Sequence, residues 1–427
     1  MSLSLDRRQA VAALVQGLGL VTSGAVLAGC AGAKPGQIGT TSSITPPPVG
    51  AAAAKTPLSA ASGPVKIALL LPLSGNAQTA AVAKAMRAAA ELALFERNAA
   101  ELQLIVKDDK GTEAGARAAV EAALGEGAEL IIGPFFSRCV AAIAPAARQA
   151  GVAVIAFSNN PAQAGSGIYL LGYTAAAEVE RAIGYASAKG HRRFAALIPD
   201  GAEGRVWEPA FRAAVARAGG SIALVERYNA GANGLVDPAR RLQDAIKVAV
   251  SGATPVDALF FPGDQETLPQ LDVLMPQLEL DAQRVRLLGS SSWDYPSVHT
   301  LSRLAGAWFA TPDPAGWREF SERFGRSYGT MPPRLASLSH DAVVMAGALA
   351  TSPKGSRYTQ ANLTRSSGFA GADGAFRLQP SGLVDRSLAV LELGVAGPVV
   401  VDAAASVINS PQAAGKSLSP AKNASLN

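Results

Sequence analysis

The segment Val65–Leu71 is a continuous apolar run that stops at Pro72. Runs of this kind are typical of strands that are buried on both faces of a parallel sheet. Thr79–Arg97 follows with helical spacing and an alanine-rich composition, with Glu91 and Glu96 placed for solvent. The sequence therefore predicts a strand followed by a helix, which is the first unit of an α/β fold.

The same alternation of strand and helix continues along most of the chain. In the first series we expect strands at Leu102–Val106, Glu129–Ile132, Val152–Phe157 and Tyr169–Tyr173, and helices at Glu113–Leu124 and Arg138–Ala150. In the second series we expect strands at Arg193–Ile198, Ser221–Arg227, Asp257–Phe261 and Val285–Leu288, and helices at Ala176–Lys189, Arg205–Ala218, Val236–Val250 and Glu266–Leu278. Two successive series in a chain too long for one ordinary core predict an α/β protein with two doubly wound parallel-sheet lobes around a cleft.

The last third of the chain carries fewer elements. Helices are expected at Trp317–Tyr328 and Leu335–Ala350, and a final strand at Val384–Leu393. Residues 403–427 show no periodicity and are expected to form a disordered tail.

The first 30 residues have the features of an export signal. Arg7-Arg8 precedes an apolar run from Ala10 to Ala28, which leads into Leu27-Ala28-Gly29-Cys30. This pattern resembles a bacterial lipoprotein signal (residues 1–29), with cleavage before Cys30 and lipid attached to that cysteine. A transmembrane anchor is the alternative, and the paired arginines leave open whether export follows the general or the twin-arginine route.

Residues 30–63 are mostly Gly, Ala, Thr, Ser and Pro, with few large side chains. Such a segment buries too little apolar surface to offset the entropy of ordering it, so we expect a disordered tether. If Cys30 is lipidated, Cys139 is the only other cysteine, and a disulfide framework is excluded. Cys139 is expected to be a small buried residue.

Charge and motifs argue against several classes of function. The net charge is +5, but no Lys/Arg stripe alternates with aromatic residues, so no nucleic-acid partner is expected. His191, His299 and His340 lack the spacing of metal ligands, and no nucleophile elbow, phosphate loop or dinucleotide fingerprint is present. We therefore expect no catalytic residues, no metal and no cofactor.

Polar and aromatic side chains follow several of the predicted strands. Ligands of doubly wound sheets bind beyond the carboxyl ends of the strands, where helix N-termini also favour anions. The candidate residues for binding a small polar ligand in the cleft are Ser74, Asn76, Phe136, Ser137, Ser158, Asn159, Asp200, Asp264, Trp293 and Asp294. For each of them, a role in a turn or a helix cap is the alternative.

Four stretches of the chain resemble the type I periplasmic-binding-protein superfamily, whose members include leucine-binding proteins. These stretches are Val65–Gly75, Ile132–Pro134, Val154–Pro161 and Ser339–Ala342. The resemblance implies two lobes joined by three crossings of the chain. The implied first lobe is 64–172 plus about 311–372, and the second is 173–310 plus about 373–402.

Three further stretches are similar to the penicillin-binding protein activator lipoproteins of alphaproteobacteria: Tyr169–Tyr173, Leu288–Asp294 and Arg334–Leu338. Amino-acid receptors of the superfamily place an aromatic residue and a glycine where this chain has Thr79–Ala81, and an Ala-Thr pair where it has Ser158–Asn159. Loss of the aromatic wall places binding of a branched-chain amino acid in doubt. An amide or a sugar-peptide fragment remains as a ligand.

The resemblance leads to three functional hypotheses. The first is a periplasmic lipoprotein that activates a peptidoglycan synthase of the penicillin-binding protein class; it contacts the membrane through its N-terminal lipid only. Ala31, directly after Cys30, indicates anchoring in the outer membrane. The alternative is the substrate-binding component of an ABC importer, which would partner a permease and carry amino acids or other small polar ligands. An orphan sensor domain is the third hypothesis.

Overall fold

The computed structural model describes residues 63–97, 101–229, 231, 233–248, 255–276, 285–295 and 297–405. The expected signal peptide, Cys30 and the tether up to residue 62 lie outside the described residues, as does the expected tail beyond residue 405. Among the described helices, none is both long enough and apolar enough to cross a bilayer.

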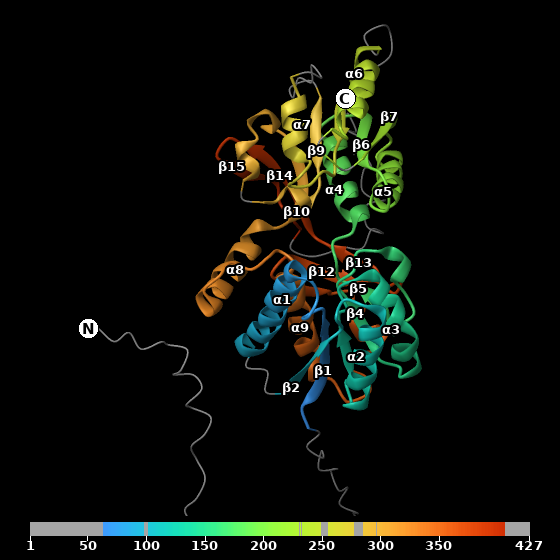
Figure 1. Cartoon of the computed structure of the whole chain (residues 1–427), viewed down its shortest axis with the longest axis vertical. Helices are drawn as coiled ribbons and strands as arrows, with labels where there is room; N and C mark the ends of the chain where they lie inside the picture. The colour runs from blue at the N-terminus through green and yellow to red at the C-terminus, as the bar shows by residue number, and fades with distance from the viewer. Residues whose placement is uncertain are drawn as a thin grey trace, which may run out of the picture. The chain divides into compact units, whose positions relative to one another are not determined.

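The first sheet has five parallel strands in the order β2-β1-β3-β4-β5 (Figure 1). Its strands are β1 (Val65–Leu71), β2 (Leu102–Asp108), β3 (Leu130–Ile132), β4 (Ala153–Ala156) and β5 (Ile168–Leu170). The helices of this part of the chain are α1 (Ala77–Glu96), α2 (Glu113–Gly125), α3 (Ser137–Gln149), α8 (Pro314–Tyr328), α9 (Ala336–Ala350) and α10 (Gln360–Leu363).

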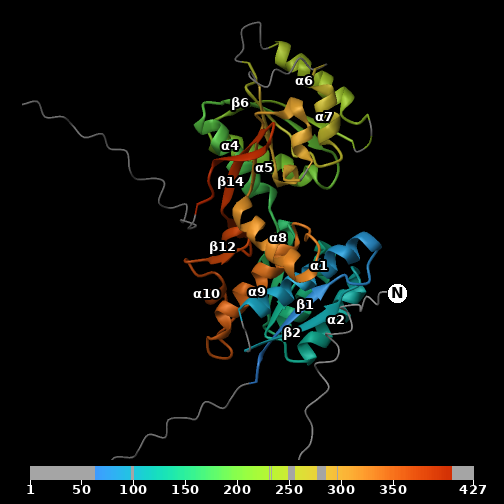
Figure 2. The ribbon, with the colours of Figure 1, turned by 90° about the vertical axis from the view of Figure 1, so that its left-hand side faces the viewer.

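Helices cover both faces of the first sheet because the side chains of β1 alternate between two cores. Ile67, Leu69 and Leu71 pack with residues of α1 and α9, whereas Ala68 and Leu70 pack with residues of α2 and α3. A further cluster joins α1, α8 and α9, which Figure 2 shows along the same side of this lobe. The continuous apolar run of β1 therefore reflects burial on both faces.

The second sheet has seven strands in the order β15-β14-β10-β9-β8-β6-β7. Its strands are β6 (Arg193–Pro199), β7 (Ser221–Tyr228), β8 (Ala258–Phe260), β9 (Arg286–Gly289), β10 (Trp308–Pro312), β14 (Leu388–Gly394) and β15 (Gly397–Asp402). Helices α4 (Ala175–Ala188) and α5 (Gly204–Arg217) pack on one face, and α6 (Val236–Val248) and α7 (Leu268–Leu274) pack on the other. The expectation of an α/β protein with two lobes of parallel strands is confirmed, except that β14 and β15 are antiparallel.

The last part of the chain differs from the expected division. Residues 373–386 were assigned to the second lobe, but the three-stranded sheet β11 (Phe369–Gly371), β12 (Gly374–Leu378) and β13 (Val384–Arg386) contributes side chains to the core of the first lobe. The expected strand Val384–Leu393 is therefore two strands, and the chain crosses between the lobes at Ser387. The expected tail also begins too early, because the carbonyls of Ala403 and Ala405 accept hydrogen bonds from Arg181 and Ser387.

Candidate functional site

The loops after β3 and β4 are joined through Asn160. Its side-chain nitrogen donates to Oγ of Ser137 at 2.9 Å, and its backbone N–H donates to Oγ of Ser158 at 3.2 Å. Ser158 is buried, whereas Asn159 is exposed to solvent. The Ser137 hydroxyl therefore connects the two loops, whereas the Ser158 hydroxyl stabilises the turn within the loop after β4.

Two other first-lobe candidates lie after β1. The backbone N–H of Ser74 donates to Oδ1 of Asp108 at 3.3 Å, and Oδ1 of Asn76 accepts from the backbone N–H of Thr79 at 2.9 Å. Asn76 thus caps α1, which carries no acidic residue in its first turn. Both candidate side chains are exposed and lie at the N-terminus of this helix.

A pocket of about 180 Å³ lies between the N-terminal half of α1 and the loop after β3. It is lined by Pro72, Gln78, Thr79, Val82, Ala83, Met86, Phe135 and Phe136. The two phenylalanine rings meet edge to face at 5.0 Å between centroids, and the guanidinium of Arg138 lies over the Phe136 ring at 4.7 Å. The aromatic surface of this pocket therefore comes from the loop after β3.

The tight turn after β3 places these rings. Gly133 has a φ of +96°, and a Cβ at this position would collide with the carbonyl oxygen of Leu70. Only glycine adopts this conformation against a neighbouring strand without strain. Phe136 then stands at the N-cap of α3, directly before Ser137.

Two of the second-lobe candidates form turns. Oδ1 of Asp200 accepts from the N–H of Gly201 at 2.8 Å. Oδ1 of Asp264 accepts from the N–H groups of Glu266 and Thr267, both at 3.1 Å, and from the Thr267 hydroxyl at 3.0 Å. Their carboxylates thus have the local role that was the alternative for these residues.

Trp293 does not line a cleft, contrary to the expectation. Its side chain is fully buried in the core of the second lobe, with its ring 6.1 Å from that of Phe309. Gly289 leaves the space that the indole fills, since a Cβ there would overlap the ring. An aromatic residue after a strand looks the same in sequence whether it faces a cleft or the core.

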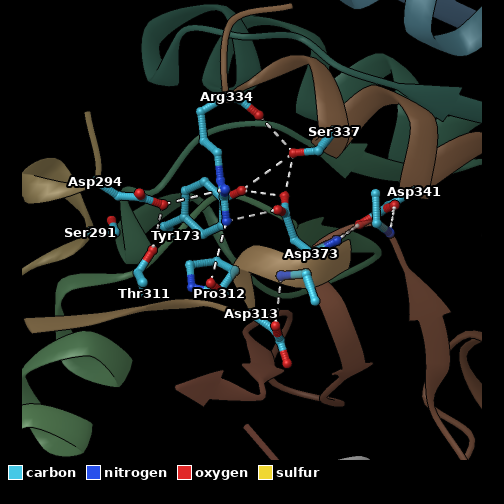
Figure 3. Close-up of polar contacts among 12 residues, drawn as sticks. Tyr173, Ser291, Asp294, Thr311, Pro312, Asp313, Arg334, Ser337, Asp341 and Asp373 are labelled. Atoms are coloured by element: carbon cyan, nitrogen blue, oxygen red, sulfur yellow. Dashed lines mark hydrogen bonds and ion pairs between the residues drawn. The ribbon is translucent and has the colours of Figure 1, made fainter. Parts of the chain in front are cut away.

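Asp294 is the second-lobe candidate that meets the first lobe. Its Oδ2 lies 3.4 Å from Nη1 of Arg334 and accepts from the hydroxyl of Thr311 at 3.2 Å (Figure 3). Arg334 precedes α9 in the first lobe, and its Nη2 also lies 3.1 Å from Oδ1 of Asp373. The guanidinium lies over the ring of Trp317 at 4.7 Å.

Asp373 is fully buried and connects Arg334 to the first crossing of the chain. Its Oδ2 accepts hydrogen bonds from the hydroxyls of Tyr173, at 2.5 Å, and Ser337. Burial is the main cause that raises the pKa of Tyr173, with a further contribution from the neighbouring Asp373 carboxylate. We call Tyr173, Asp294, Arg334, Ser337 and Asp373 the crossing network; Figure 3 shows them converging from both lobes.

The family is decided by a comparison that spans most of the fold. The family model described as "Periplasmic binding protein" matches residues 64–399, which run from β1 into β15. The chain belongs to the periplasmic binding protein family. The superfamily resemblance of the sequence is thereby confirmed, and the family is one of binding proteins.

Solved structures of solute-binding proteins share the fold of this periplasmic binding protein. A structure from Rhodospirillum rubrum, described as a branched-chain amino acid ABC transporter, has a TM-score of 0.69 and 21% identity, covering 79% of this chain and 100% of that chain. A solute-binding protein from Rhodopseudomonas palustris in complex with benzoate has a TM-score of 0.59 and 16% identity, covering 82% and 98%. The branched-chain amino acid binding protein of Streptococcus pneumoniae, with isoleucine bound, has a TM-score of 0.57 and 19% identity, covering 81% and 99%. The comparison with curated proteins finds no match.

One buried carboxylate of this periplasmic binding protein was not anticipated from the sequence. Glu178, in the first turn of α4, is 4% exposed and accepts hydrogen bonds from Ser291, at 2.8 Å from its N–H and 3.0 Å from its hydroxyl. Burial raises the pKa of Glu178 to about 7, although both hydrogen bonds favour the ionised form. Glu178 holds the loop after β9, and therefore Asp294, against α4.

Cys139 of this binding protein is a free thiol in the core, as expected, and burial raises its pKa to about 11. Within the described ranges, no three His, Cys, Asp or Glu side chains are grouped to hold a metal ion. The arrangement supports binding: an apolar pocket next to a helix N-terminus in one lobe, and a polar network at the crossings.

Proposed function

We propose that this protein is the solute-binding component of an ABC importer and that it binds a small molecule with one apolar group. The observation that carries the proposal is the pocket lined by Phe135, Phe136 and Met86 at the carboxyl ends of β1 and β3. Its volume of about 180 Å³ is close to that of an engineered protein cavity of about 150 Å³ that takes up benzene. A single aromatic ring or a branched aliphatic group therefore matches the pocket in size and polarity.

The charge of the ligand is argued from the rim of the pocket. Gln78 and Thr79 line the pocket at the start of α1, a helix of 20 residues with no acidic side chain in its first turn. The N-terminus of a helix favours a negative group by its dipole and its unpaired N–H groups. We propose a small carboxylate that carries a ring or a branched chain, and related structures with benzoate and with isoleucine bound fall within this class.

A thermal-shift screen of the purified chain tests this function. Benzoate, 3,4-dihydroxybenzoate, leucine, isoleucine and valine are the probes. A ligand present at 100 times its dissociation constant adds about 2.7 kcal/mol to the free energy of unfolding. A rise of the melting temperature with one of these carboxylates supports the proposal, and no rise with any of them, at concentrations up to 10 mM, contradicts it.

The second candidate function is activation of a peptidoglycan synthase. It is favoured by one observation: Tyr173, Asp294, Arg334 and Ser337 of the crossing network all come from the stretches that resemble the activator lipoproteins. In a regulator, this network would hold the lobes in one arrangement without a ligand. Capture of a penicillin-binding protein by the tagged chain, together with a negative carboxylate screen, would favour this function.

The location of the protein in the cell is also a proposal. The family is that of periplasmic binding proteins, and we propose that the lipid on Cys30 attaches this member to the outer membrane. Metabolic labelling with a clickable palmitate, compared between the natural chain and Cys30→Ser, tests the anchor. Fractionation of the two membranes tests its place.

A further inference from the structure

The two lobes have separate hydrophobic cores. Each core cluster of the described residues draws its side chains from one lobe, the first comprising 63–173 and 313–386 and the second 174–312 and 388–405. The chain passes between them near Tyr173, Asp313 and Ser387. Two bodies joined only by short crossings rotate relative to each other unless specific contacts fix them.

Arg334 makes such a contact. In the first lobe it is held by Asp373, at 3.1 Å, and by stacking on Trp317. Toward the second lobe, Nη1 lies 3.4 Å from Oδ2 of Asp294, and Nη2 donates to the carbonyl of Pro312 at 3.5 Å. The side chains of Arg334 and Asp294 are 21% and 24% exposed, so solvent screens their attraction only in part.

The contact with Asp294 is incomplete. Nη1 of Arg334 is buried and has no hydrogen-bond partner, and Asp294 lies beyond good hydrogen-bond distance. A planar guanidinium and a carboxylate form their strongest pairing through two parallel hydrogen bonds. A small rotation of the second lobe toward Arg334 would provide the missing bond.

We infer that Arg334 is a positioning residue that sets the arrangement of the two lobes by holding Asp294. Asp373, Tyr173 and Ser337 fix Arg334 in the first lobe, and Thr311 orients the Asp294 carboxylate in the second. Without the attraction between the two side chains, the lobes sample a wider range of separations. This role goes beyond the proposed function, because it concerns the lobes whether the protein serves as a receptor or as a regulator.

Distances between spin labels on the two lobes test the inference in the full chain. The labels are attached at Ala118→Cys on α2 and Ala213→Cys on α5, two exposed positions, in a Cys30→Ser background. The variants are Arg334→Gln, Asp294→Asn and both together. The matched control is Arg357→Gln, which breaks an ion pair within the first lobe, 2.9 Å from Glu129.

We expect both single variants to broaden the distance distribution to the same degree, and the double variant to broaden it no further. The control should lower the melting temperature and leave the distribution unchanged. An unchanged distribution in Asp294→Asn overturns the inference. This variant leaves the pair of Arg334 and Asp373 intact, so it tests the inference even if Arg334→Gln does not fold. Broadening in Arg334→Gln alone also overturns it, because Arg334 would then act through Asp373.

Discussion

Glu178 accepts two hydrogen bonds from Ser291, one from the backbone N–H at 2.8 Å and one from the hydroxyl at 3.0 Å. These two bonds hold the loop that carries Asp294 at the start of α4. The Glu178 carboxylate is buried, and burial raises its pKa to about 7. Its ionisation therefore affects stability near neutral pH.

The first prediction is that Glu178 makes the fold less stable as pH rises from 5 to 8. Between its ordinary pKa and about 7, the folded state binds this proton and the unfolded state does not, so the free energy of unfolding falls with rising pH. The contribution is on the order of 3 kcal/mol. Urea denaturation across this range should show that the free energy of unfolding falls less steeply with pH in Glu178→Gln than in the natural protein. In Glu180→Gln, which changes an exposed residue of the same helix, it should fall as in the natural protein. Equal slopes in all three proteins would contradict the assignment.

The second prediction concerns two histidines whose pKa values are shifted in opposite directions. His340 is 5% exposed; its Nδ1 lies 3.2 Å from Oδ1 of Asp341, and its Nε2 lies 3.3 Å from Oε2 of Glu96. Burial lowers the pKa of His340, but the two carboxylates outweigh it and raise the pKa above its ordinary value; burial lowers the pKa of His191. NMR titration of the imidazole protons should give a pKa above 6.5 for His340 and a pKa below 6.5 for His191.

The stability linked to His340 has a defined sign. Because its folded pKa is raised, its contribution is fully present below about pH 6.5 and is lost as pH rises through the folded pKa. Glu96→Gln should lower the pKa of His340, and Glu91→Gln on the same helix should not. A His340 resonance that titrates below that of His191 would refute this account.

Much of the fold could be predicted from sequence because local patterns determine it. The run Val65–Leu71 and the helical spacing that follows correspond to β1 and α1. Strand β10 was not predicted, since Trp308–Pro312 is short and ends in proline. The strand Val384–Leu393 is interrupted because Ser387 lies at a crossing, and crossings leave no local pattern.

The candidate site was harder to predict than the fold. The loops at strand ends were found, and Phe136 lines the pocket as a candidate should, but Trp293 belongs to the core. Arg334 follows two prolines and has the sequence appearance of a surface residue, yet it meets Asp294, which is 40 positions earlier. Contacts of such sequence separation depend on the packing of both lobes. The lipid on Cys30 stays a prediction.

The third prediction tests the packing that buries Trp293. Gly289→Ala would place a Cβ within the indole ring, and overpacking of this kind costs about 1–3 kcal/mol. Gly184→Ala is the matched control, because this glycine lies in the middle of α4 with open space around its missing Cβ. The control should be neutral or stabilising by about 0.5–1 kcal/mol. Equal stability of the two variants in chemical denaturation would show that Trp293 is not fixed as described.

The fourth prediction tests the central claim, that the pocket on the first lobe binds the apolar group of a ligand. Ala83 is 1% exposed and lines the pocket, so Ala83→Leu fills part of it, whereas Ala81→Leu adds the same atoms on the exposed side of α1. Isothermal titration with benzoate, 3,4-dihydroxybenzoate, leucine, isoleucine and valine measures the affinity of each protein. We predict that one of these ligands binds the natural chain and Ala81→Leu equally and binds Ala83→Leu at least tenfold more weakly. Equal affinity for Ala83→Leu, or no binding of any of the five ligands to the natural chain, would contradict the account.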